Sequence, residues 1–319
     1  MLRNILKWTL IAALPLAAAP AAAQTYGLAT SAPGGLLHAL GTALSKVISE
    51  KTTLRVRVQP FGGTSQSLPL IDSGEVSVGM NNVTEFDFAY NGTGFFAGRK
   101  HPKLRLVGVM VPYFFSVAVK KDSPIQSIAD LKGTRLPTVY RSQKIAGLLF
   151  RATLATVGLR EADLKRVPVP NVGRGANDFA AGKTDGFFFA IGAGKVAETS
   201  AKVGGIRFLP LSGSNEAMAG MHSVAPKTFL RTLKPAKRLV GIVKPTQVMG
   251  DYFTLIASTG VSDDVIYRMT KAAYENRDAL IKAHGAYRLF QPKGMAKDYG
   301  LPYHAGAIKF YKEAGLWKR

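Results

Sequence analysis

Residues 104–120, which read LRLVGVMVPYFFSVAVK, decide the fold. They form two apolar runs, 104–111 and 114–120, joined at Pro112-Tyr113, and each has the length of a buried strand. A third apolar run, 252–257, comes much later in the chain. If both regions cross between two lobes, the chain builds most of one lobe, then all of the other, and returns to finish the first. We therefore predict lobe I from residues 24–115 and 252–319, and lobe II from residues 116–251.

Strand-like and helix-like patterns alternate on both sides of this stretch. Residues 54–59 alternate apolar with polar side chains and predict a half-buried strand, and further strands are expected at 25–30, 75–80, 133–139, 187–191 and 206–211. Helices are expected at 36–48, from Gly62 through Ile71, from an N-cap at Ser142 to about Val157, and from an N-cap at Ser262 through Leu280. This alternation predicts an α/β fold with largely parallel sheets. Two such lobes would enclose a ligand cleft.

Composition excludes several classes of protein. The chain has 319 residues, 47% of them hydrophobic, and no Cys, which rules out disulfide frameworks, iron–sulfur clusters and thiol catalysis. With 42 Lys+Arg against 20 Asp+Glu, the net charge is +22 and favours anionic partners.

The first 23 residues are typical of a cleaved signal peptide. Arg3 and Lys7 precede an apolar run at 8–16 and an Ala-rich end at Ala23. The alternative is a membrane anchor, but the run is shorter than the ~20 residues that a span needs, and Pro15 interrupts it. We therefore expect a mature protein in the periplasm, which argues against nucleic acid as a partner.

No catalytic or metal-binding constellation is evident. The five histidines stand far apart along the sequence. Gly182-Lys183-Thr184 lacks the glycine that a phosphate loop needs at position 177, and Gly192-Ala193-Gly194-Lys195 lacks the third glycine of a dinucleotide fingerprint. We predict no enzyme activity, no metal and no cofactor.

Three turns rich in glycine or hydroxyl side chains, at 30–35, 61–65 and 141–143, precede predicted helices, where free backbone N–H groups can bind an anion. Each turn taken alone is explained by helix capping. All three, however, follow the predicted carboxyl ends of strands, which is where α/β folds bind ligands. Asn81-Asn82 adds amides after another strand, and Tyr113 would form a wall of the cleft. Arg141 offers a carboxylate two parallel donors, although a solvated arginine fits the sequence equally. The predicted ligand-binding residues are Thr30, Ser31, Gly34, Gly35, Gly63, Thr64, Ser65, Asn81, Asn82, Tyr113, Arg141, Ser142, Gln143 and Phe189.

Four motifs, in order along the chain, resemble the TAXI family, the periplasmic solute-binding subunits of TRAP transporters. They are Phe61-Gly62-Gly63-Thr64-Ser65, Ala89-Tyr90-Asn91-Gly92-Thr93-Gly94, Ser127-Ile128-Ala129-Asp130-Leu131-Lys132-Gly133 and Pro302-Tyr303-His304-Ala305-Gly306-Ala307-Ile308-Lys309-Phe310-Tyr311. The resemblance implies a two-lobed, type II-like binding protein that closes on a small carboxylate, such as glutamate, and delivers it to a TRAP membrane permease.

One turn departs from the family. Where the family usually has a Gly-Ser-Gly-Thr-like turn, this chain has Val139-Tyr140-Arg141-Ser142-Gln143, so the family's substrate does not transfer directly. We expect an anionic ligand held partly by Arg141, and a monomer. The alternative is a periplasmic sensor module that passes its liganded state to a receptor kinase.

Overall fold

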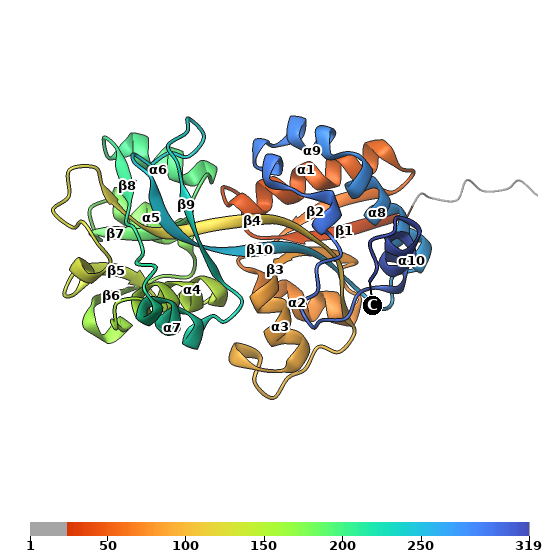
Figure 1. Ribbon diagram of the computed structural model, residues 1–319, viewed down its shortest axis with the longest axis horizontal. Coiled ribbons are helices and arrows are strands. Elements are labelled where there is room, and N and C mark those ends of the chain that lie inside the picture. Colours follow the sequence, from red (N-terminus) through yellow and green to blue (C-terminus); the bar gives the residue numbers. More distant parts are fainter. Residues whose placement is uncertain (1–23, 319) are drawn as a thin grey trace, which may run out of the picture.

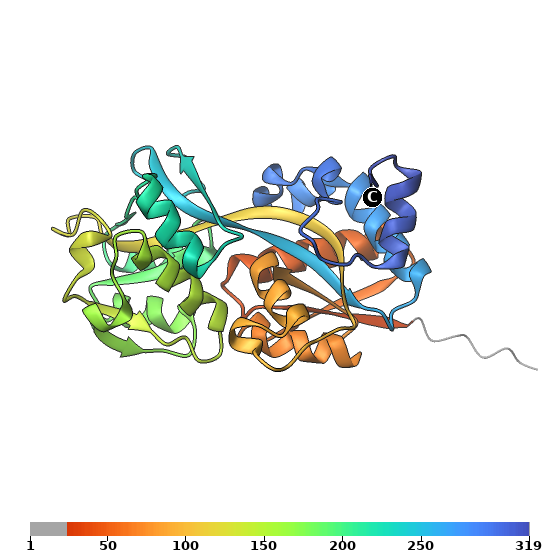
Figure 2. The same cartoon turned by 60° about the horizontal axis from the view of Figure 1, so that its bottom comes forward.

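The structure is a computed structural model that describes residues 24–318, so the predicted signal peptide lies outside the described residues. Two long strands, β4 (Leu104–Lys120) and β10 (Thr246–Ser258), run between two groups of elements, as both views show (Figures 1 and 2). We call these groups the first and the second lobe. The chain leaves the first lobe through β4 and returns through β10.

The first lobe holds the start and the end of the described chain (Figure 1). Its elements are β1 (Thr25–Thr30), α1 (Leu36–Lys51), β2 (Arg55–Pro60), α2 (Thr64–Ser73), β3 (Val78–Asn82), α3 (Val83–Asn91), α8 (Asp263–Glu275), α9 (Arg277–Ala283), η4 (Gly285–Leu289) and α10 (Ala305–Glu313). The second lobe holds β5 (Arg135–Thr138), α4 (Lys144–Ala155), β6 (Lys165–Pro168), α5 (Val172–Ala180), β7 (Gly186–Ala190), α6 (Gly194–Lys202), β8 (Ile206–Phe208), α7 (Asn215–Val224) and β9 (Phe229–Leu233).

One mixed sheet runs through both lobes. Its order is β2-β1-β3-β10-β4-β7, with β8 beside β4 and β9 beside β10, while β5 and β6 pair separately. β1 is parallel to β2 and β3, but β10 is antiparallel to β3, β4 and β9. The prediction of largely parallel sheets is therefore wrong for this sheet, because the two crossing strands run in opposite directions.

β4 is one continuous strand, whereas the sequence predicted two strands joined at Pro112-Tyr113. A proline interrupts a strand by removing a donor from the ladder. Here Pro112 pairs with Tyr252 on one side, and β7 pairs with β4 over Phe115–Val119, beyond the proline. Pro112 therefore lies at a local edge of the sheet, where its missing N–H costs little.

Two predicted helices also differ in the structure. The helix expected to start from a cap at Ser142 begins one residue later, at Lys144, because the Gln143 N–H donates to the Tyr140 carbonyl at 2.9 Å and Gln143 therefore still belongs to the preceding turn. The helix after Ser262 has the predicted cap, with Ser262 accepting from Val265 N, but it breaks at Asn276 into α8 and α9. Among residues 24–318, no helix combines the length and the apolar character needed to span a membrane.

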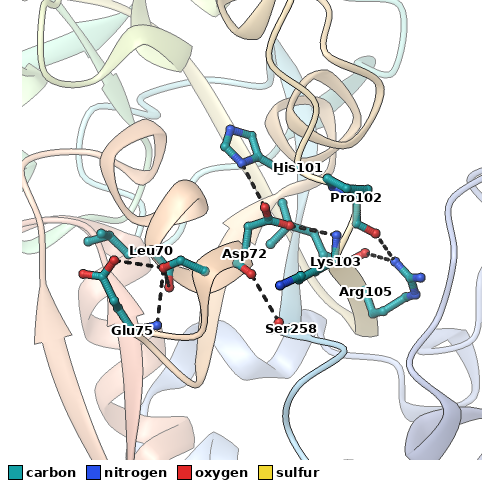
Figure 3. A network of polar contacts seen from close by, with 10 residues as sticks. Leu70, Asp72, Glu75, His101, Pro102, Lys103, Arg105 and Ser258 are labelled. Carbon is teal, nitrogen blue, oxygen red and sulfur yellow. Dashed lines mark hydrogen bonds and ion pairs between the residues drawn. The ribbon is translucent and has the colours of Figure 1, made fainter.

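The start of β4 and the end of β10, which both lie in the first lobe, are hydrogen-bonded to α2 (Figure 3). Asp72, near the end of α2, accepts the Lys103 backbone N–H at 2.8 Å and contacts His101 Nδ1 at 3.4 Å. Ser258 Oγ, at the last residue of β10, donates to the Asp72 carbonyl at 3.5 Å. These contacts join both crossing strands to the first lobe at one point.

Candidate ligand-binding cleft

The lobes meet at two adjoining chambers. An inner chamber of about 70 Å³ is lined mainly by apolar side chains of α1, α4, β4, β7 and β10. An outer vestibule of about 410 Å³ is more polar and is lined by the starts of α1, α5 and α6. The chambers share Ser31, Gly35, Gln143, Val172 and Phe189 in their walls. A solute could therefore occupy both, with its apolar part inside and its polar part outside.

One wall of the inner chamber is aromatic and is formed by side chains of β4 and β10. Side chains two residues apart point to the same face of a strand, so Tyr113 and Phe115 of β4 share one face. The ring of Phe253 on β10 stacks on Tyr113 with a centroid distance of 3.8 Å and an interplanar angle of 4°. All three residues line the chamber.

Two buried carboxyl groups lie behind the polar part of this wall. Glu85 accepts hydrogen bonds from the Thr64 hydroxyl and, at 3.2 Å, from Asn82 Nδ2, and both partners line the inner chamber. Asp251 lies opposite Tyr113 in the β4–β10 ladder and accepts the Tyr252 N–H at 2.7 Å. Burial raises the pKa of Glu85 and that of Asp251 to about 7. The inner chamber is therefore backed by two acids that change their protonation state near neutral pH.

The vestibule wall combines helix N-termini with an ion pair, Lys195 and Glu198. The starts of α1, α5 and α6 and the loop before α2 contribute Gly35, Gly173, Lys195 and Gly62 to its wall, and a helix N-terminus carries a partial positive charge. Lys195 donates to Glu198 at 2.8 Å, and Glu198 also accepts from Lys202 at 2.7 Å. These bonds lower the pKa of Glu198 to about 2.

Direct contacts across the cleft show that the structure is closed. Lys195 N donates to the Gly34 carbonyl at 3.3 Å, and Lys144 N donates to Ser65 Oγ at 3.3 Å. At Gly63, an added Cβ would lie 2.1 Å from the carbonyl oxygen of Ser142. The glycine is therefore required for the lobes to approach this closely.

Eight of the fourteen predicted site residues line the two chambers. They are Ser31, Gly34, Gly35, Thr64, Asn82, Tyr113, Gln143 and Phe189. Gly63, Ser65 and Ser142 instead form the contact between the lobes. Thr30 and Asn81 are buried behind the wall. The three predicted turns thus come together at one cleft, and ligand contact by each residue stays a prediction.

Arg141 lies outside both chambers. Its side chain is exposed, and its backbone N–H donates to the Val169 carbonyl at 3.2 Å. The cation that the vestibule wall does contain, Lys195, was not among the predicted residues. Its position as the second residue of a helix that follows Gly192-Ala193 is the signal that could have identified it.

The turn before α4 has an unusual backbone. Val139 and Tyr140 have φ angles of 72° and 47°, a region that non-glycine residues rarely adopt. The Tyr140 N–H donates to the Thr138 carbonyl at 2.9 Å, which makes Val139 the centre of a γ-turn of the rarer, more strained hand. Tyr140 is fully buried, so packing of its ring holds the turn in place.

Comparison with known proteins agrees with this geometry. The model of the NMT1-like family matches residues 28–315. A solved structure described as a periplasmic transporter is 16% identical, covers 91% of this chain and 92% of its own, and has a TM-score of 0.56. An R. palustris protein with adipate is 15% identical, with coverages of 91% and 92% and a TM-score of 0.55. The alkanesulfonate-binding protein SsuA from Xanthomonas axonopodis pv. citri bound to MOPS is 16% identical, with coverages of 92% and 94% and a TM-score of 0.54.

These similarities confirm the predicted fold class, an α/β two-lobed fold of the periplasmic binding proteins. At such low identity they show the fold alone. The resemblance to the TAXI family stays a prediction.

Proposed function

We propose that this chain, which belongs to the NMT1-like family, is a periplasmic solute-binding protein that captures a small carboxylate and delivers it to a TRAP membrane permease. The observation that carries this proposal is the cleft itself, an apolar chamber that opens into a vestibule bordered by helix N-termini. In this proposal residues 1–23 are a cleaved signal peptide. The lobes comprise residues 24–115 with 252–319, and residues 116–251.

The two chambers favour one orientation of the solute. Among the described residues, the wall of the inner chamber contains no Lys or Arg, and Glu85 and Asp251 lie behind it, so a carboxylate there would be desolvated without a cationic partner. In the vestibule the same group meets helix N-termini and Lys195. The solute therefore places an aliphatic or aromatic body inward and its carboxylate outward.

Hinge closure follows from the contacts of such a solute. Thr64 and Phe253 belong to the first lobe, whereas Leu149 and Phe188 belong to the second, and all four line the inner chamber. A ligand that touches both sides gains contacts that exist only in the closed state, and thereby shifts the population toward closure. β4 and β10 are the hinge.

A thermal-shift screen of residues 24–319 tests the binding function. The panel contains glutamate, pyroglutamate, 2-oxoglutarate, adipate and longer or aromatic monocarboxylates, each beside the amide or alcohol of the same size. A ligand at a hundred times its Kd stabilises the folded state by ~2.7 kcal/mol. We expect hits among acids with an apolar body. Stabilisation by the neutral analogues alone would contradict the carboxylate proposal.

A pair of variants then locates the carboxylate. Lys195→Ala removes the cation in the vestibule wall, and Arg141→Ala removes the exposed cation that the sequence predicted to bind. For a ligand found in the screen, we expect Kd to rise at least tenfold in Lys195→Ala, about 1.4 kcal/mol, and to change less than twofold in Arg141→Ala. The reverse result would indicate that Arg141, and not Lys195, binds the carboxylate.

Delivery needs a separate experiment. Uptake of the identified solute into proteoliposomes that contain a TRAP permease from the same organism should depend on adding the protein. Uptake that proceeds equally without it, together with binding of the liganded protein to a receptor kinase, would support the sensor alternative instead.

A further inference from the structure

A second groove lies on the other face of the β4–β10 pair. Two adjoining cavities of about 200 Å³ each share Pro112, Arg288 and Leu289 in their walls. Pro112 and Phe114 of β4 and Tyr252 of β10 line them. By strand alternation these residues face away from Phe115 and Phe253, which line the inner chamber. We call this feature the hinge groove.

The hinge groove is strongly basic. Arg231, Arg238, Arg288 and Lys297 line it, and neither cavity has Asp or Glu among the described residues of its wall. Elsewhere in the molecule arginines pair with carboxylates, for example Arg135 with Asp185 at 2.6 Å. Over residues 24–318, none of the four groove cations forms such an ion pair. Their charges are therefore uncompensated within the described protein.

Aromatic rings hold two of these cations over the groove. The guanidinium of Arg231 lies 5.9 Å from the centre of the Phe114 ring, and Lys297 Nζ lies 4.6 Å from the centre of the Tyr252 ring. Contacts of this kind favour a fixed position for a cation and leave its N–H donors open to an anion. His284, also in the wall, adds a hydrogen-bonding ring, because burial lowers its pKa and favours the neutral form.

The cations come from both lobes. Arg231 lies on β9 and Arg238 in the loop after it, in the second lobe, whereas Arg288 on η4 and Lys297 belong to the first lobe. An anion with a single charged group can satisfy one side only. One with two or three groups can contact both, and arginine binds carboxylate and phosphate groups through paired donors.

We propose that the hinge groove is a second ligand site, separate from the cleft, which binds a small polyanion with two or three carboxylate or phosphate groups. Leu36 and Tyr113 line both the inner chamber and the groove, so one layer of side chains separates the two sites. An anion in the groove bridges the lobes across the hinge and thereby acts on the same movement that closes the cleft.

Calorimetric titration of the mature protein with citrate, succinate and acetate tests this site. Ionic strength is held at about 0.15 M, because the mature protein, which lacks Arg3 and Lys7, has a net charge of +20 (42 − 2 − 20) and attracts every anion weakly at low salt. We expect saturable binding that strengthens from acetate to succinate to citrate. The double variant Arg231→Gln/Arg288→Gln should weaken citrate binding at least tenfold.

The control removes the same charge elsewhere. Arg55→Gln/Arg57→Gln alters two exposed side chains on β2 and should change citrate affinity less than twofold. Equal weakening in both double variants, or no saturable citrate binding, would overturn the proposal. Lys195→Ala separates the two sites: if it alone abolishes citrate binding, the anion occupies the vestibule and the hinge groove is not a site.

Discussion

The two buried carboxyl groups beside the inner chamber make stability depend on pH. Burial raises the pKa of Glu85 and that of Asp251 to about 7, well above their values in an unfolded chain. Between about pH 4 and 7 the folded state therefore binds more protons than the unfolded state, and this contribution to the free energy of unfolding decreases as pH rises. Well above pH 7, where both acids are ionised in either state, this contribution to the free energy of unfolding is absent.

Glu85→Gln tests this dependence, because glutamine imitates the protonated acid at every pH. Relative to the natural chain, we expect the variant to gain stability between pH 5 and pH 8 by an amount on the order of 2–3 kcal/mol. Urea denaturation at the two pH values measures the change. Glu50→Gln, at an exposed position on α1, is the control and should give no such trend. A constant difference between Glu85→Gln and the natural chain would contradict the prediction.

The turn before α4 offers a second prediction for single residues. Val139 has a φ of 72° and a side chain that is 39% exposed, so glycine would relieve its backbone without leaving a cavity. A left-handed conformation costs an ordinary residue ~1–2 kcal/mol, part of which the added freedom of glycine in the unfolded chain offsets. We expect Val139→Gly to raise the free energy of unfolding by up to ~1 kcal/mol.

Val157→Gly is the matched control, since Val157 is 38% exposed and lacks a positive φ. There the same substitution should lower stability, by ~0.5–1 kcal/mol. Chemical denaturation of both variants gives the comparison. If both lose stability equally, the turn is not strained.

Among the elements, the junction of α2 with β4 and β10 depends on one carboxylate. Asp72 is the acceptor for the Lys103 N–H and the partner of His101. Asp72→Ala leaves both groups without this partner, and we expect it to lower the free energy of unfolding by ~1–2 kcal/mol. Asp122→Ala, in the exposed turn after β4, should change it by less than ~0.5 kcal/mol. Similar losses in both variants would contradict a specific role for the junction.

Elements with regular patterns were predictable from the sequence. The apolar positions of α1, among them Leu40 and Leu44, are buried as expected, and strands β1 and β7 lie where alternation or an apolar run indicates them. The start of β10 was missed because Gly250 and Asp251 interrupt its apolar run. The continuity of β4 through Pro112 depends on which strands lie beside it, which the local sequence does not contain.

The candidate site was predictable only where its residues have distinctive chemistry. Gly34, Thr64 and Gln143 belong to turns that follow strands, and the structure places them at the cleft. The apolar wall was missed because Leu149 and Phe188 have the pattern of ordinary core residues. Whether such side chains face a cavity depends on how the two lobes approach each other.

At the scale of the whole molecule, closure depends on the close approach at Gly63. Its backbone φ of −172° suits any residue, so Gly63→Ala introduces no backbone strain, but the new Cβ would collide with the Ser142 carbonyl. We expect this variant to favour an open cleft, with a larger radius of gyration in solution scattering and at least tenfold weaker binding of the cleft ligand.

Gly194→Ala is the control for this experiment, because a Cβ at Gly194 meets no atom within 4 Å. It should close and bind like the natural chain. Gly63→Ala with unchanged scattering and affinity would show that the lobes can close without this contact.

The arrangement of the chain ends has a practical consequence. Both β1, where the described chain starts, and α10, near its end, belong to the first lobe, and the described chain enters and leaves the second lobe through β4 and β10 (Figure 1). A surface tether or fused fluorophore attached after α10 would therefore hold one lobe still and leave the other free to swing. A dye on the second lobe away from the cleft, for example at Asp122 in the exposed turn after β4, would then report solute capture as a change in distance to the anchored end, which suits the protein to use as an optical sensor.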